Sequence, residues 1–339
     1  MSQRVLAAMA MAVLSLGTLL PRPALGHPSG LPVLKERVDL LWSDAGTWLL
    51  WDFHESIVIG CVVLGLLYGL AVTVWRAPLG MTPKTPEEKS TLHSQIALFY
   101  GNLGILYLSL DGPLHHLADE LLFSAHMLQH MLLQLLWAPL LVVSVPRALW
   151  RAIIRPVLPL ARWATRPTVA FLLFNGVVFG WHIPQLYNVA LTIHAWHIVQ
   201  HLMFMSTAVI MWFVVIAPLP ELSSTYAKRM TFVLVNMLSM KLLGVIISLA
   251  DDVLYTFYLS QPRAWGIDAM SDQQLGGMLM WLPGGGVLWA GLGRIFWQWV
   301  RTGTPPRGQS GIPELDRARA ERNQRRRDAE AAVEPVAAA

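Results

Sequence analysis

The residues best suited to chemistry are histidines at helical spacing in two apolar stretches of the sequence. His126 and His130 are four residues apart in the first stretch. In the second stretch, His194, His197 and His201 follow at intervals of three and four. At about 100° per residue, each set lies within about 60° on one face of its helix. Imidazole is the commonest metal ligand near neutral pH, and imidazoles buried in a membrane need partners. The five side chains therefore predict a metal site between two helices.

Further polar residues near these stretches are expected to complete the site. Met205 continues the stripe of His201 about 6 Å deeper along the helix, and its thioether would be a soft ligand. If the first helix extends back to Pro113, His115 and Asp119 lie on the same stripe as the first histidine pair. We expect an outer group that orients the ligands or receives the ion: Asp111, His115, His116, Asp119 and His182.

The donor types narrow the choice of metal. Imidazole alone suits copper, zinc or iron, and an added thioether favours copper. The chain has one cysteine, Cys61, so a paired-thiolate copper clamp is excluded. We expect copper, as Cu(I). Three alternatives remain at this point: a histidine-rich di-iron membrane oxygenase, a haem protein with facing histidines as axial ligands, and a structural subunit whose histidines only form hydrogen bonds.

The composition restricts the class of protein that carries these histidines. Apolar residues make up 55% of the 339 positions and charged residues only 14%, against about 25% charged residues in ordinary soluble domains. Such a chain cannot cover a globular surface with polar groups, which excludes a soluble enzyme. The apolar content also excludes a disordered protein, and one cysteine excludes a disulfide scaffold.

Seven apolar runs approach the roughly 20 residues that cross a bilayer. Backbone groups in lipid must bond within their own segment, so these runs should be helices. The predicted fold is therefore all-α, a polytopic membrane protein with seven transmembrane helices after a cleaved N-terminal signal peptide. The runs cover 56–75, 94–110, 121–145, 168–187, 193–217, 228–250 and 275–300.

The N-terminus has the pattern of a secretory signal. Arg4 precedes an apolar run, and small residues lead to a predicted cut after Gly26; the alternative is an uncleaved first span. We expect a signal peptide at 1–26, an outer segment at 27–55, a seven-helix membrane domain at 56–300 and a cytoplasmic, partly disordered Arg-rich tail at 301–339.

The basic residues predict the orientation in the membrane. Loops 76–93, 146–167 and 218–229 together carry ten Lys and Arg, whereas the alternate loops carry only Arg263. Basic loops stay in the cytoplasm, so the N-terminus should be outside and the C-terminus inside. Residues 302–339 carry seven Arg against six acidic residues, a balance that does not favour nucleic acid. Ten of the 11 histidines then lie on the outer side: His27, His54, His115, His116, His126, His130, His182, His194, His197 and His201.

Four segments carry a resemblance to a known family: DGPLHHLADELLFSAHMLQHMLL (111–133), GWHIPQLYNVAL (180–191), HAWHIVQHLMF (194–204) and DQQLGGMLMWLPGG (272–285). They resemble the CtaG family of polytopic cytochrome c oxidase assembly factors, associated with caa-type oxidases. The likeness runs over nearly all of residues 50–300. It implies a non-enzymatic protein of the bacterial cytoplasmic membrane that helps to mature a haem–copper oxidase, with the oxidase subunits and the lipid bilayer as its partners.

The histidine pattern and the resemblance together predict a mechanism. Copper arrives from the outer side and is held by His126, His130, His194, His197 and His201, with Met205 as a soft ligand. It then passes sideways to an oxidase subunit through a contact within the membrane.

Overall fold

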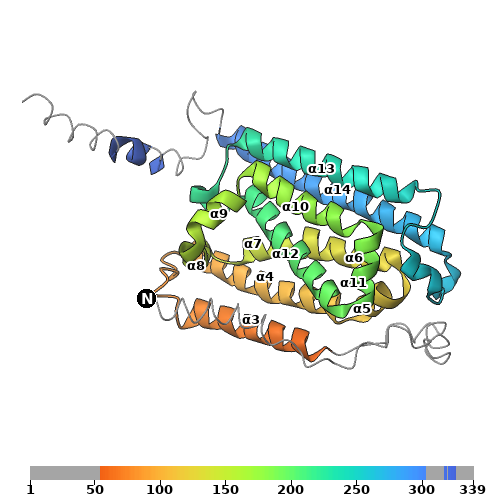
Figure 1. The fold of residues 1–339 in the computed structure, drawn as a ribbon. Helices are drawn as coiled ribbons and strands as arrows, with labels where there is room; N and C mark the ends of the chain where they lie inside the picture. Colours follow the sequence, from red (N-terminus) through yellow and green to blue (C-terminus); the bar gives the residue numbers. More distant parts are fainter. Residues whose placement is uncertain (1–53, 303–316, 319, 326–339) are drawn as a thin grey trace, which may run out of the picture.

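The computed structural model describes residues 54–302, 317–318 and 320–325. In these residues every regular element is a helix, which confirms the prediction of an all-α protein. The long helices run side by side, with the short helices α8 (Arg147–Ile154) and α9 (Leu158–Ala164) at one end of the bundle and α5 (Pro113–His116) at the other (Figure 1). The predicted signal peptide at 1–26 lies outside the described residues, as does nearly all of the outer segment at 27–55.

Five described segments are long and apolar enough to cross a membrane. A sixth is possible if the bent pair α10 and α11 counts as one span. The chain is therefore a multi-pass membrane protein. The five are α3 (Glu55–Thr73), the run Phe123–Ser144 formed by α6 (Phe123–Met131), η3 (Leu132–Trp137) and α7 (Ala138–Ser144), α12 (His194–Ile216), α13 (Tyr226–Ser248) and α14 (Ala269–Thr302).

The predicted run 94–110 lies in α4 (Pro86–Leu110), which is long but is not among these segments. The polar residues His93, Gln95 and Asn102 lie within α4, and they lower the mean hydropathy of this helix. The count of seven spans is therefore not confirmed. The remaining short elements are η2 (Leu117–Leu121), η4 (Arg155–Val157), η5 (Pro220–Leu222), η6 (Thr256–Ser260) and η7 (Ala264–Gly266).

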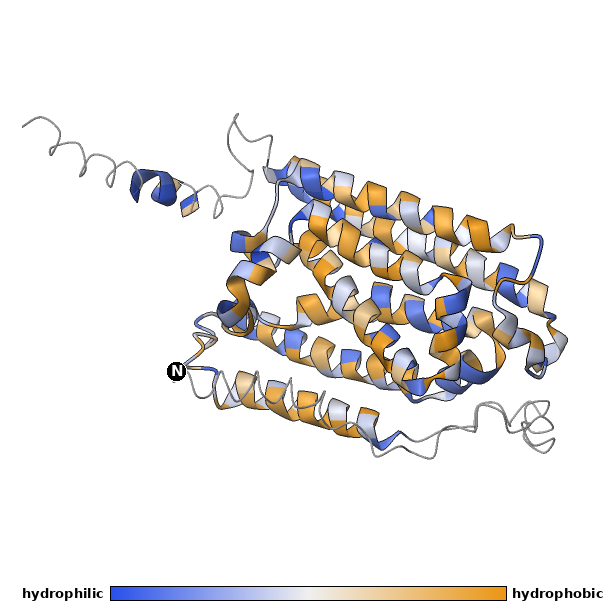
Figure 2. Cartoon of the chain, in the orientation of Figure 1, coloured by the Kyte–Doolittle hydropathy of each residue, from blue (hydrophilic) through white to orange (hydrophobic). Residues whose placement is uncertain are grey.

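Apolar side chains also cover the outside of the bundle. Figure 2 shows apolar residues along the length of the helices and hydrophilic ones mainly at the helix ends. Large residues such as Leu66, Leu238 and Leu282 are more than half exposed. Exposed apolar surface of this extent is expected where lipid replaces water.

The predicted span 168–187 is not one straight helix. The structure divides it into α10 (Pro167–Trp181) and α11 (Pro184–Thr192), bent by 74°. Pro184 has no N–H to donate, and it disfavours helical backbone in the preceding residue, Ile183. The break follows from this proline.

The third predicted span also departs from a continuous helix. We expected one helix from Pro113 through His130, and this was wrong. Leu122 has an extended backbone, with φ −131° and ψ 125°, between the π-helical turn η2 and α6. The N–H groups that this break releases are bonded to a carboxylate of another helix, described below with the site.

A second π-helical segment, η3, lies deeper in the same span. Its wider turn changes the backbone pairing, and two of its carbonyls bond to side chains of other helices. Trp212 Nε1 donates to the Gln134 carbonyl at 2.8 Å, and Asn102 Nδ2 donates to the Trp137 carbonyl at 3.0 Å. These bonds tie η3 to α12 and α4.

The bond from Trp212 gives a stability prediction. Trp212→Phe keeps most of the aromatic volume but leaves the buried Gln134 carbonyl without this donor. A buried polar group left unsatisfied costs about 1–3 kcal/mol, so the variant should unfold at lower temperature in detergent. Trp289→Phe is the control, because Trp289 is 55% exposed. Equal unfolding temperatures for the two variants would contradict the role given to this bond.

Candidate metal site

Four imidazoles from two helices meet in the interior of the bundle. His126 and His130 of α6 have their Nε2 atoms 2.6 Å apart, and those of His197 and His201 of α12 are 2.7 Å apart. Each pair is joined by an N–H···N hydrogen bond, in which one ring donates and the other accepts. We call His126, His130, His197 and His201 the imidazole cluster.

The two pairs face each other across the helix interface. The ring centroids of His126 and His197 are 5.5 Å apart with planes inclined by 17°, and those of His130 and His201 are 5.0 Å apart. All four side chains are at most 8% exposed. Helical spacing alone predicted this meeting, because residues four apart lie on one face.

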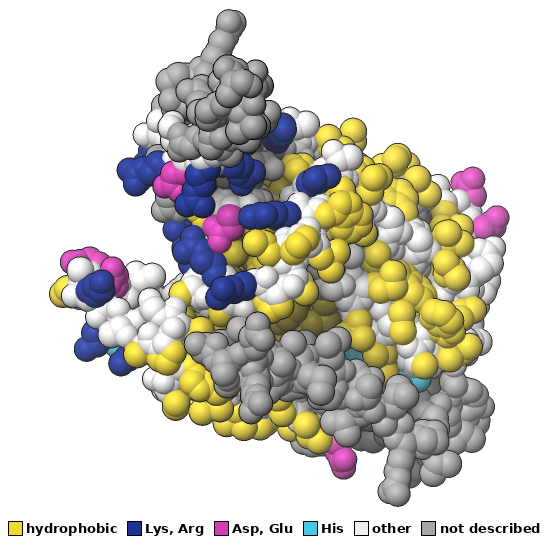
Figure 3. Space-filling model, turned by 60° about the vertical axis from the view of Figure 1, so that its left-hand side comes forward, with side chains coloured by type: hydrophobic (Ala, Val, Ile, Leu, Met, Phe, Trp, Pro, Cys, Tyr) yellow, Lys and Arg dark blue, Asp and Glu magenta, His cyan; other side chains and the backbone are white. Residues whose placement is uncertain are grey.

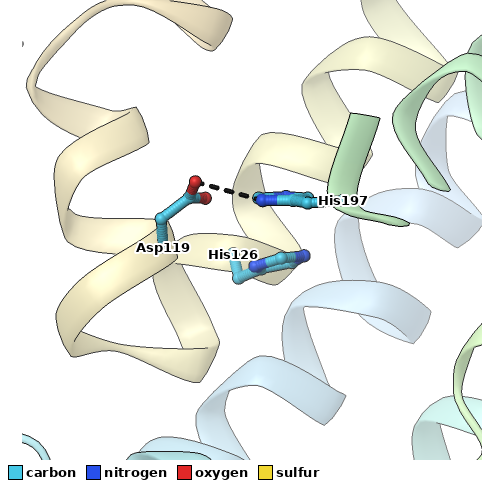
Figure 4. A group of neighbouring side chains, drawn as sticks. All are labelled: Asp119, His126 and His197. Atoms are coloured by element: carbon cyan, nitrogen blue, oxygen red, sulfur yellow. Dashed lines mark ion pairs between the residues drawn. The ribbon is translucent and has the colours of Figure 1, made fainter. Parts of the chain in front are cut away.

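Asp119 closes the outer side of the cluster. It lies in η2, and its Oδ2 is 3.2 Å from Nδ1 of His197 (Figure 4). Potential ligand atoms of Asp119, His126 and His197 all lie within 4.8 Å of one another. Because the backbone breaks at Leu122, η2 does not continue α6, and from this position its carboxylate reaches His197 of α12.

Asp119 is charged, because imidazoles surround it. Burial alone would raise its pKa, but His115 and His197 hold the pKa of Asp119 well below its ordinary value. Nε2 of His115 is 3.5 Å from the same carboxylate oxygen. The partly buried carboxylate therefore offers a negative charge to any cation that enters the cluster.

The hydrogen bonds of the α12 pair indicate which ring nitrogens of His197 and His201 carry a proton. Since Nδ1 of His197 donates to Asp119, its Nε2 carries a lone pair and accepts from Nε2 of His201. Nδ1 of His201 is then unprotonated, and it is buried without a hydrogen-bond partner among the described residues. A carboxylate that orients a ligating imidazole in this way is a common feature of metal sites.

The distances within each pair are those of hydrogen-bonded rings and are shorter than the separation of two ligands on one ion. Two nitrogen ligands of one tetrahedral ion lie about 3.3 Å apart, given metal–nitrogen bonds of about 2.0–2.1 Å. The paired Nε2 atoms, at 2.6 and 2.7 Å, must therefore exchange their mutual hydrogen bond for bonds to the ion. The imidazole cluster and Asp119 supply five donors of the kind that copper or zinc accepts.

The residues predicted to lie around the cluster form an outer chain of contacts. Nδ1 of His115 accepts from Nε2 of Gln129 at 3.0 Å, and the His115 ring is 5.1 Å from that of His54. The buried Asp111 accepts from both the backbone N–H and Nδ1 of His54, at 2.7 and 2.8 Å. Asp111 thus holds His54 beside His115 and does not itself reach the cluster.

Two other predicted residues sit beside the cluster. His182 donates Nδ1–H to the Val178 carbonyl at 2.6 Å, which leaves its buried Nε2 without a partner among the described atoms. Its ring is 6.1 Å from that of Phe204. His116 lies 3.7 Å from Glu120 of the next turn. It is part of the outer helical turns rather than of the cluster.

Two predicted ligands are less buried than the four rings of the cluster. His194 is the exposed first residue of α12. Met205 is partly buried and packs against the apolar core, whereas Phe204 is the residue that contacts His130, with ring centroids 4.5 Å apart. Ligand roles for His194 and Met205 remain predictions.

Residues outside the predicted ligand set position the site. Asp272 of α14 is fully buried and accepts from the backbone N–H groups of Phe123 and Ser124, at 2.7 and 3.0 Å. It therefore caps the start of α6, as an N-terminal carboxylate does, but from another helix. Tyr258 donates to the Ala118 carbonyl at 3.0 Å and so holds η2. The motif around Asp272 was visible in the sequence, but its distant partner was not.

The cap from Asp272 can be tested by a graded pair of variants. Asp272→Ala leaves two buried N–H groups without an acceptor and should cost about 2 kcal/mol or more. Asp272→Asn keeps one amide oxygen and should cost less. The measurement is the thermal unfolding of each variant in detergent, with Asp251→Ala, an exposed carboxylate of the preceding loop, as control. A loss no larger than that of the control would refute the cap.

Comparison with known proteins adds one positive finding. A family model described as "Cytochrome c oxidase caa3 assembly factor (Caa3_CtaG)" matches residues 66–302. This range covers more than half of the chain and includes the imidazole cluster, Asp119 and Asp272. No curated protein matches the chain, and no solved structure matches it either.

Proposed function

Because the chain belongs to the family of cytochrome c oxidase caa3 assembly factors, we propose that it binds copper at the imidazole cluster and delivers it to the oxidase. The observation that carries this proposal is the convergence of four buried imidazoles and one carboxylate at the interface of α6 and α12. Copper is the cargo here, as Cu(I), and the acceptor is an oxidase subunit in the same membrane.

A path for the ion follows the outer chain of rings. His54, His115 and His197 succeed one another with ring centroids 5.1 and 6.3 Å apart. Copper first meets His115 and Asp119, which are partly exposed. It then moves to His126 and His197, and finally to the deeper pair His130 and His201. Each step exchanges neutral imidazole ligands, and the Asp119 charge offsets that of the cation.

The proposed topology has seven spans, with α4 as the seventh beside the five long spans and the bent pair. The basic loops lie at the cytoplasmic side and the imidazole cluster near the outer side. This arrangement rests on the ten Lys and Arg of three loops. The membrane is then the bacterial cytoplasmic membrane, and copper enters from outside it.

The geometry favours copper transfer over the alternatives. A haem between α6 and α12 would need a slot for its macrocycle, but the rings of His130 and His201 are 5.0 Å apart and Phe204 packs beneath them. Di-iron membrane oxygenases use about eight histidines, and the described cluster has four. We therefore propose a non-enzymatic role.

Removal of the imidazole pairs should abolish copper binding. We expect detergent-purified protein loaded with Cu(I) to retain copper, and His126→Ala/His130→Ala and His197→Ala/His201→Ala variants to lose it. His93→Ala is the matched control, because His93 is exposed on α4. Elemental analysis after gel filtration measures the copper content, and oxidase activity of cells carrying each variant measures delivery. Copper retained by both double variants would disprove the site.

We expect the loss of the Asp119 charge to weaken copper binding without abolishing it. Asp119→Asn removes the charge and weakens the orientation of His197, and such changes around ligating histidines typically cost 10–100-fold in metal affinity. Competition with a Cu(I) chelator measures the loss. Glu120→Gln, which alters the neighbouring carboxylate beside His116, should change affinity much less. An equal effect of the two variants would argue against a specific role for Asp119.

A further inference from the structure

A pocket of about 500 Å³ lies at the end of the bundle opposite the outer histidines. It is bounded by the ends of α7, α12 and α13 and by α14. Three arginines of the membrane domain line it, namely Arg147, Arg229 and Arg294. Figure 3 shows Lys and Arg side chains gathered at this end of the molecule. We call these three residues and their cavity the arginine pocket.

Arg229 is the unusual member of the arginine pocket. It is only 2% exposed, and its Nη2 donates to the Val215 carbonyl at 2.6 Å. Its Nε is buried without a partner among the described residues. A guanidinium has five N–H donors, and at least the Nε donor of this buried cation is unused.

Apart from the Tyr226 ring, whose centroid is 5.5 Å from the guanidinium carbon, the electrostatic surroundings of Arg229 do not favour a cation. It lies in the first turn of α13, where the helix dipole favours an anion rather than a cation. Among the residues that the structure describes, no carboxylate lines the arginine pocket or pairs with any of its three arginines. A buried charge without a counter-ion is costly, and an anionic ligand would remove that cost.

The position of the pocket indicates where the anion comes from. Its other walls include the apolar side chains of Val142, Val145 and Ile216, at the ends of membrane-spanning segments. Phospholipid headgroups lie at this level, and basic pockets between helices recognise anionic ones. We propose that the arginine pocket binds the phosphate headgroup of an anionic phospholipid, with Arg229 as its buried donor and Arg147 and Arg294 at its rim.

The proposal predicts a lipid preference that can be measured on the purified, full-length protein. Native mass spectrometry in detergent should show phosphatidylglycerol bound at least tenfold more tightly than phosphatidylcholine. Arg147→Gln/Arg294→Gln removes two exposed rim charges, each contributing about fivefold, and should abolish most of this preference. Arg155→Gln, an exposed arginine at the same end that does not line the pocket, should retain it.

Three further measurements test the role of Arg229, the lipid preference itself and the source of the anion. Arg229→Gln should also lose the preference, with gel filtration reporting whether it folds; the rim variant carries the test if it does not. Equal binding of the two lipids by the unaltered chain would overturn the proposal. Inorganic phosphate at millimolar concentration should not displace phosphatidylglycerol; displacement would assign the pocket to a free anion and overturn the lipid source. None of these readings depends on copper, so they stand apart from the proposed function.

Discussion

Backbone hydrogen-bonding groups in an apolar interior must find partners. The candidate site depends on one break in a helix whose backbone N–H groups are bonded by a side chain distant in the sequence. At Leu122 the helix is interrupted, and the released N–H groups of Phe123 and Ser124 bond to Asp272, about 150 residues later in the chain. The interruption lets η2 leave the axis of α6. Asp119 can then approach His197 while His126 keeps its place on α6. Without a buried acceptor at this point, an unbroken helix would be the more stable backbone, and the carboxylate would follow that helix.

The same requirement explains how the helices that carry the imidazole cluster are bonded to one another deeper in the bundle. The π-helical segment η3 exposes carbonyls that lipid could not satisfy, and Trp212 and Asn102 bond to two of them. Trp212 lies on α12, the helix that also carries His197 and His201. The bond therefore fixes the register of α12 against the third span, about three turns from the histidines. Irregular backbone inside a membrane protein is tolerated where other helices supply the partners, and here those partners also align the two halves of the site.

These particulars separate what the sequence could predict from what it could not. The pairing of His126 and His130 with His197 and His201 follows from helical phase, because polar rings on an otherwise apolar helix must face inward. The helical membrane fold follows from composition for the same reason. The break at Leu122 could not be predicted, since its cause, Asp272, is local to a different helix. The seven-span count depended on α4, whose polar residues Gln95 and Asn102 lower its mean hydropathy. Both bond to carbonyls of the third span, and Asn102 is buried there.

A protein that delivers a metal must bind it reversibly. The paired imidazoles suit the delivery proposed here. Each Nε2 of the imidazole cluster has a hydrogen-bond partner, because His126 bonds to His130 and His197 to His201. Under the proposed function, an ion bound at these nitrogens would replace the hydrogen bonds, and its release would let them form again. The net free energy of binding would then be lower than the metal–nitrogen bonds alone would provide, since buried hydrogen bonds would be recovered on release. A site with separated, unpaired imidazoles would hold the ion more tightly, because its release would leave those buried groups unsatisfied.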